Sequence, residues 1–181
     1  MFTDEEIRIA NATYRSKGSS VFDKDGNVRS VVARFVASNI NKDAKVLDFG
    51  CGSEFIQGKY LRQLGFDVDG WDFGENKPKE CVGSLEQVYD VVYASNVLNV
   101  ISSLSMLMET LKQIYGCLKD GGVFVANYPK SPRKMVLIEE DLALMIQQIF
   151  GGQVSKLHGV SSPTWVFTKV AHKTSQIALG A

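Results

Sequence analysis

The stretch Lys45-Val46-Leu47-Asp48-Phe49-Gly50-Cys51-Gly52-Ser53-Glu54-Phe55 decides the fold of this chain. A short apolar run meets an acid and then two glycines, which is the pattern of a buried strand that ends in a tight turn. Gly50 and Gly52 lack the Cβ atom that would obstruct a positive φ or a close backbone approach to a ligand. Asp48 places a carboxylate where the strand ends. The stretch therefore predicts a pocket for a nucleotide-type cofactor.

Length and composition limit the remaining possibilities. The chain has 181 residues, of which 45% are apolar, and we expect a single domain over residues 1–181. Its 20 basic and 20 acidic residues balance, so no net field draws it to nucleic acid or to an anionic membrane. Cys51, Cys81 and Cys117 lie far apart without Cys-x-x-Cys spacing, which argues against a disulfide framework and a zinc site.

Neither a signal peptide nor a run of the ~20 apolar residues that a membrane span needs is found in this sequence. We therefore expect a cytoplasmic protein with no membrane partner and no metal.

Helical and strand patterns alternate along the chain. Apolar residues at helical spacing predict helices at residues 4–14, 28–40, 55–64, 104–118 and 135–150. Apolar runs predict buried strands at residues 46–49, 66–73, 90–95 and 123–127, and residues 82–85 fit a very short further strand. Two final runs, residues 154–158 and 165–170, leave no room for a helix between them and should pair antiparallel.

This order predicts an α/β fold: a doubly wound, mostly parallel seven-stranded sheet with a reversed last strand, helices on both faces and a short N-terminal helical lid. Residues 1–40 would form the N-terminal helices and lid loop, residues 41–170 a Rossmann-like core, and residues 171–181 a flexible tail. The loop from Arg15 to Asn27 is long for a connector, which is typical either of a lid or of a flexible surface loop.

Residues 28–170 resemble the class I S-adenosylmethionine-dependent methyltransferases. Five features occur in the family's order: the first motif at Val46 to Gly52, the ribose-binding acid at Asp72, the fourth strand at Tyr89 to Val92, the turn at Leu118 to Val123, and the final hairpin with its reversed seventh strand.

Two details distinguish S-adenosylmethionine from a dinucleotide. The dinucleotide fingerprint Gly-x-Gly-x-x-Gly needs a glycine where this chain has Phe55. Asp48 would repel a pyrophosphate, whereas it favours the ammonium and sulfonium groups of S-adenosylmethionine. We therefore expect S-adenosylmethionine as cofactor, and a nicotinamide-dependent dehydrogenase is the disfavoured alternative.

The resemblance also implies which residues hold the cofactor. Phe49, Gly50, Cys51 and Gly52, with Asp48 at the lip, would line the methionine part; Asp72 would bind the ribose; Phe73 would pack on the adenine, flanked by Ser84 and Leu85; Ser95 and Asn96 would lie under the sulfonium side. Phe73 could equally be plain core and Ser84 a strand cap. Glu54 departs from the family, because many members have a third glycine there.

No catalytic residue is evident, and the chemistry explains why. Methyl transfer is an in-line displacement at an activated carbon, so alignment and desolvation supply much of the catalysis, and a base is needed only if the nucleophile must lose a proton early. Asn99 and Tyr128 are weak candidates for catalysis. His158 fits better as a structural residue of the hairpin.

The methyl acceptor is open at this point. Arg15 and Lys17 would be substrate or lid residues or, alternatively, solvated charges. A small molecule is the favoured acceptor, and a basic rim of Lys130, Arg133 and Lys134 keeps nucleic acid open. The absent base, the weak third strand and Glu54 also allow a second function, a non-catalytic cofactor-binding or partner-binding module.

Overall fold

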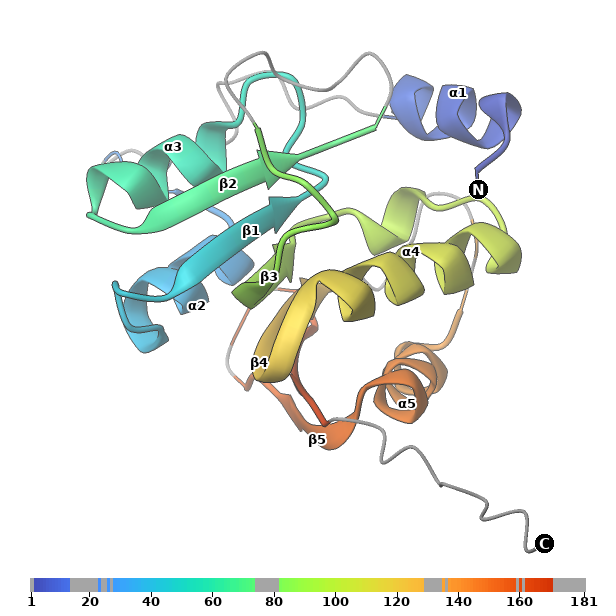
Figure 1. The fold of residues 1–181 in the computed structure, drawn as a ribbon. Helices are drawn as coiled ribbons and strands as arrows, with labels where there is room; N and C mark the ends of the chain where they lie inside the picture. The colour runs from blue at the N-terminus through green and yellow to red at the C-terminus, as the bar shows by residue number, and fades with distance from the viewer. Residues whose placement is uncertain are drawn as a thin grey trace, which may run out of the picture.

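The computed structural model describes residues 2–13, 23, 26, 28–73, 82–128, 135, 137–158, 160 and 162–170. Within them the predicted α/β fold is confirmed, since one mixed sheet has helices on both faces (Figure 1). The strands are β1 (Lys45–Phe49), β2 (Asp67–Trp71), β3 (Tyr89–Ala94), β4 (Leu118–Asn127), β5 (Gly151–Lys156) and β6 (Thr164–Lys169).

The strand order is β2-β1-β3-β4-β6-β5. Strands β2, β1, β3 and β4 are mutually parallel, and β6 runs antiparallel to both of its neighbours, β4 and β5. The predicted hairpin and reversed last strand are therefore confirmed. Strands β1 to β4 all end at one edge of the sheet, which we call the carboxyl edge; the opposite edge is the amino edge.

The helices are α1 (Asp4–Thr13), α2 (Val31–Asn39), α3 (Ile56–Gln63), α4 (Leu104–Cys117) and α5 (Glu139–Phe150), with a 3-10 turn, η3 (Leu98–Val100). Serine hydroxyls cap two of them, because Ser30 accepts from Ala33 N and Ser103 accepts from Met106 N. None of the helices in the described part of the chain is long and apolar enough to cross a membrane.

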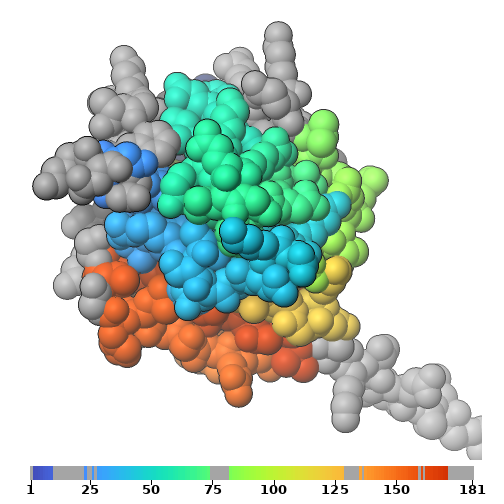
Figure 2. Space-filling view, turned by 90° about the vertical axis from the view of Figure 1, so that its left-hand side faces the viewer, coloured from blue at the N-terminus to red at the C-terminus, as the bar shows by residue number. Residues whose placement is uncertain are grey.

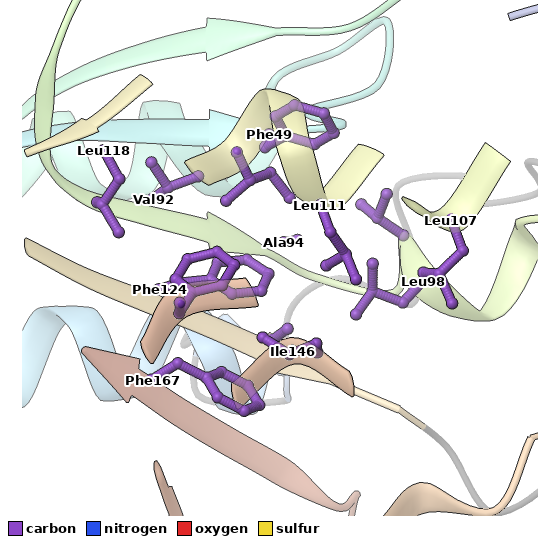
Figure 3. Packing of buried hydrophobic residues seen from close by; sticks show 14 of the residues in the cluster. Phe49, Val92, Ala94, Leu98, Leu107, Leu111, Leu118, Phe124, Ile146 and Phe167 are labelled. Atoms are coloured by element: carbon purple, nitrogen blue, oxygen red, sulfur yellow. The ribbon is translucent and has the colours of Figure 1, made fainter. Parts of the chain in front are cut away.

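Alternation along the central strands separates the core into two layers. Val91 and Tyr93 of β3 pack with α2 and α3, whereas Val92 and Ala94 of the same strand pack with α4 and α5. Figure 3 shows the second layer, where Phe124 and Phe167 lie beside Ile146 of α5. Figure 2 shows the left-hand side of the molecule in Figure 1, where α2, in blue, lies between the teal residues around α3 and the orange C-terminal segment.

The predicted seventh strand is wrong for residues 82–85, because the structure describes six strands and these residues belong to none of them. Gly83 N donates to Gly70 O over 3.1 Å, which is the only backbone bond that the described residues show between this segment and β2. A Cβ atom at Gly83 would lie 2.4 Å from the same oxygen. The segment therefore touches the end of β2 and turns away without forming a ladder.

Two predicted boundaries are also wrong. Helix α5 begins at Glu139 and not at residue 135, since the Tyr128 hydroxyl binds Met135 O and Leu137 N and holds these residues outside the helix. Strand β4 begins at Leu118 and not at residue 123, because it already pairs with Tyr89 before a shift in register.

Candidate functional site

The glycine turn after β1 lies against the end of β2. Gly50 N and Cys51 N both donate to Trp71 O, over 2.7 and 3.2 Å, and Gly50 and Gly52 have φ angles of 76° and 67°. A Cβ atom at Gly50 would lie 2.5 Å from Val97 Cγ2. Positive φ and this close approach explain why the turn requires glycine.

Asp72, the expected ribose-binding acid, lies beside this turn. Its Oδ2 accepts from Gly52 N over 2.7 Å, and its Oδ1 accepts from Phe73 N over 2.8 Å. Burial raises the pKa of this carboxyl, against the lowering effect of the two amides. Each carboxylate oxygen has a second lone pair, so both oxygens can still accept a hydroxyl proton from a ligand.

Asp48 lies deeper, on the face of the sheet that α2 and α3 cover. The Tyr93 hydroxyl and Gly58 N, in the first turn of α3, lie close enough to its carboxyl to lower its pKa. Burial, with a smaller contribution from the charge of Asp72, raises the pKa of Asp48 to about 7. The Asp48 carboxyl therefore lies between the sheet and the first turn of α3.

Phe73 lies in a row of aromatic rings. Its ring centroid is 5.3 Å from that of Phe2 and 5.8 Å from that of Trp71, whose own centroid lies 4.6 Å from that of Phe49 in a tilted arrangement. The Ser103 hydroxyl donates to Glu6 Oε1 over 2.6 Å and so connects α1 to the start of α4. Helix α1 thus lies beside the residues expected to hold the adenine. Sequence reasoning missed Phe2, whose position no pattern indicated.

Ser84 and Leu85, expected at the adenine edge, form a turn. Ser84 Oγ accepts from Glu86 N over 3.1 Å, and Ser84 N donates to the Tyr89 hydroxyl over 3.3 Å. Leu85 is partly buried against the core layer of α4 and α5. The hydroxyl of Ser84 therefore has a local structural bond, and its role toward a cofactor stays a prediction.

Asn96, expected under the sulfonium side, has a left-handed backbone with φ 58°. Two bonds to Asn127 fix it: Asn96 N donates to Asn127 Oδ1 over 2.7 Å, and Asn127 Nδ2 donates to Asn96 Oδ1 over 2.8 Å. Asn127 was not predicted as a site residue. Its place at the end of β4, next to β3 in the sheet, is the signal that could have found it.

The three candidates for catalysis differ in their surroundings. Asn99 is buried in η3, and its Oδ1 has no hydrogen-bond partner among the described residues. The Tyr128 hydroxyl donates to Met135 O over 2.7 Å and accepts from Leu137 N over 3.2 Å, so its proton is already used in a hydrogen bond to the segment before α5. His158 is exposed after β5.

The expected substrate or lid residues Arg15 and Lys17 lie outside the described residues, as does the basic rim of Lys130, Arg133 and Lys134. Among the residues that are described, no group of His, Cys, Asp and Glu side chains could hold a metal ion. The described site is thus a set of backbone amides, two buried acids and neutral polar side chains at the carboxyl edge.

This chain is similar in sequence to a curated methyltransferase. A probable S-adenosyl-L-methionine-dependent methyltransferase, TehB of Haemophilus influenzae, is 32% identical in an alignment of 107 residues that covers 52% of this chain and 35% of that protein. The chain thus spans about a third of the length of the curated relatives it matches.

Solved structures share the fold. A TehB-like protein of Corynebacterium glutamicum superposes with a TM-score of 0.62 and 24% identity, over 80% of this chain and 90% of that chain. CalS10, an S-adenosylmethionine-bound amino pentose methyltransferase of Micromonospora echinaspora, superposes with a TM-score of 0.58 and 13% identity, over 76% of this chain and 90% of that chain.

The sequence profile of the methyltransferase domain matches residues 23–159, which include the glycine turn, Asp72 and all of β1 to β5. The expected motifs therefore stand in the sheet positions that the resemblance implied. This chain belongs to the class I S-adenosylmethionine-dependent methyltransferases.

Proposed function

We propose that this chain transfers the methyl group of S-adenosylmethionine to an acceptor by in-line displacement. The observation that carries the proposal is the contact between Asp72 and the glycine turn, because it joins a buried carboxylate with spare acceptor positions to backbone that only glycine can form. The similarity to TehB, a probable S-adenosyl-L-methionine-dependent methyltransferase, and to a TehB-like S-adenosylmethionine-dependent methyltransferase supports the same activity.

The chemistry of the residues fits this cofactor. Spare lone pairs of Asp72 suit the two hydroxyls of a ribose, and no lysine or arginine of the described residues forms an ion pair with Asp48 or Asp72. This acidic surrounding favours the positive charge of the cofactor and disfavours a pyrophosphate. When bound, S-adenosylmethionine supplies a methyl group already activated by its sulfonium.

Each residue would hold one part of the cofactor. Phe49 to Gly52 would line its methionine part, Asp72 would accept from the ribose, Phe73 with Ser84 and Leu85 would contact the adenine, and Ser95 with Asn96 would lie under the sulfonium. These residues would align the sulfonium methyl group with a lone pair of the acceptor; S-adenosylhomocysteine would leave with the electron pair of the broken S–CH3 bond, and any proton of the acceptor would pass to water. Alignment of the two reactants and exclusion of water from the site would supply much of the rate enhancement.

Asn99 is the favoured candidate to orient the acceptor. Its buried Oδ1 has no partner among the described residues and could accept a hydrogen bond from an amine or hydroxyl nucleophile. A small molecule is the favoured acceptor, and nucleic acid is the alternative suggested by Lys130, Arg133 and Lys134, which lie outside the described residues.

Calorimetric titration with S-adenosylmethionine, S-adenosylhomocysteine and NAD tests the cofactor. We expect the two adenosyl compounds to bind and NAD not to bind. Asp72→Ala should weaken S-adenosylhomocysteine at least tenfold, because hydrogen bonds to a charged group contribute roughly 1.5–3 kcal/mol each. Asp67→Ala, at the exposed start of the same strand, is the matched control and should leave affinity unchanged.

Binding of NAD alone would overturn the proposal, and unchanged affinity in Asp72→Ala would show that the pocket lies elsewhere. Turnover needs a separate measurement. A screen of radiolabelled methyl transfer over metabolite, nucleic acid and protein pools should find an acceptor, whereas tight binding with no transfer to any pool would favour a non-catalytic module.

A further inference from the structure

Three neutral side chains from different elements meet at the carboxyl edge. Ser30, which caps α2, has its Oγ 2.9 Å from the Oγ of Ser95, which follows β3. Gln57, in the first turn of α3, donates from Nε2 to the same Ser95 Oγ over 3.2 Å. The cluster therefore joins α2, α3 and β3 at a single hydroxyl.

The hydrogen bonds of this cluster leave one proton unused. Ser30 Oγ already accepts from Ala33 N over 3.2 Å, and Ser95 Oγ accepts from Gln57. Each hydroxyl has one proton, and a single proton makes the bond between the two serines. Whichever serine donates, the hydroxyl proton of the other remains for a further acceptor.

The same cluster has an acceptor without a donor. Gln57 Oε1 is buried and has no hydrogen-bond partner among the described residues. A buried polar atom left unpaired costs about 1–3 kcal/mol, and such atoms are rare in folded proteins. A spare donor and a spare acceptor thus lie within one group of three contacting side chains, which suits a ligand that carries both an anionic and a cationic group.

We propose that Gln57 Oε1 accepts from the α-ammonium group of the cofactor's methionine part, while the spare serine proton is donated to the carboxylate of the same part. This inference rests on the proposed function. In the sheet, β1 lies between β2 and β3, so Asp72 after β2 and Ser95 after β3 flank the glycine turn from opposite sides. A cofactor whose ribose lies at Asp72 and which crosses that turn brings its amino acid end to Gln57.

A pair of ligands isolates this contact. S-adenosylhomocysteine has the amino acid end, and 5′-methylthioadenosine has the same nucleoside and thioether without it. In Gln57→Leu we expect the affinity for S-adenosylhomocysteine to fall about tenfold, the loss of one hydrogen bond to a charged group. The affinity for 5′-methylthioadenosine should stay within about twofold of the wild type, because this ligand lacks the amino acid end and its nucleoside contacts lie away from Gln57.

Gln63→Leu, at an exposed position near the end of the same helix, is the matched control and should change neither affinity. If Gln57→Leu lowered the affinity for both ligands equally, Gln57 would have a merely structural role. If it changed neither affinity, Gln57 Oε1 would not contact the cofactor. Each result overturns the inference. If the wild type binds neither nucleoside, the proposed function itself fails.

Discussion

At the amino edge of the sheet, Asp90 accepts from Lys45 N over 2.8 Å and from Lys119 Nζ over 2.7 Å. These bonds, chiefly the one to Lys119, lower its pKa. At the carboxyl edge, Asp48 and Asp72 are buried without a described cation beside them, and burial raises the pKa of both. The same residue type is therefore stabilised as an anion at one edge and destabilised as an anion at the other.

The remaining polar groups follow this division. Buried Lys169, at the amino edge, donates to Tyr115 O and Leu118 O over 2.9 and 2.5 Å. The carboxyl edge has the unpartnered oxygens Gln57 Oε1 and Asn99 Oδ1. It also has Phe55 and Asn96, which are the described non-glycine residues with positive φ.

This difference separates a structural edge from a functional one. Strained backbone, unpaired buried atoms and raised carboxyl pKa values each cost folding free energy, and such features gather where a protein binds a ligand. At the amino edge, by contrast, the charged groups of Asp90, Lys119 and Lys169 have hydrogen-bond or ion-pair partners among the described residues.

The largest expected effect comes from replacing the buried acid at the carboxyl edge. Because the pKa of Asp48 rises from 3.8 to about 7 on folding, the folded protein binds more protons than the unfolded chain in that range. Its contribution to stability is complete below about pH 4 and is lost as the pH rises to about 7, at roughly 1.4 kcal/mol per unit. Asp48→Asn should abolish that loss.

Denaturant unfolding at pH 5 and pH 8 measures the effect. We expect Asp48→Asn to gain roughly 3 kcal/mol relative to the wild type between these two values. Asp90→Asn is the matched control, since a lowered pKa gives stability that is lost only as the pH falls through the acid range. A wild-type slope that persists in Asp48→Asn would contradict the assignment.

A smaller effect is expected from a glycine that the carboxyl edge requires. A Cβ atom at Gly58 would lie 1.9 Å from the ring of Phe55, which is fully buried and cannot yield. Gly58→Ala should therefore reduce the free energy of unfolding by about 2 kcal/mol. Gly116→Ala is the control in α4: nothing lies within 4 Å of its Cβ position, and it should stabilise the protein by about 0.5–1 kcal/mol.

Urea unfolding of both glycine variants distinguishes packing from propensity. If Gly58→Ala were as stable as the wild type, the close contact with Phe55 would not constrain the start of α3. If both variants were stabilised alike, helix propensity alone would determine the effect at both edges.

The fold was predictable because its signals are local. Strand β1 and its glycine turn are adjacent in sequence, and the alternation along β3 follows directly from its period of two. The capping box of α1 is equally local, with reciprocal bonds between Thr3 and Glu6. Such features depend on residues a few positions apart.

The parts of the site that escaped prediction depend on distant pairs. Asn127 meets Asn96 across 31 positions, and Ser30 meets Ser95 across 65. Tyr128 was a candidate for catalysis. Nothing in the sequence indicates that its hydroxyl already donates to Met135 O. Hydrogen bonds of this kind are set by strand order and loop path, which no single stretch of sequence encodes.

The smallest expected effect lies at the amino edge. The Lys119–Asp90 pair is half exposed on the lysine side, with 49% of that side chain accessible, so water and salt screen most of its attraction. Lys119→Met should therefore lower the free energy of unfolding by about 0.5 kcal/mol at low salt. The deficit should shrink toward zero at 1 M salt, measured by urea unfolding in both conditions. A loss of several kcal/mol, or one that salt does not reduce, would mean that the Lys119–Asp90 pair is desolvated like the acids of the carboxyl edge, and the contrast between the two edges would no longer separate structure from function.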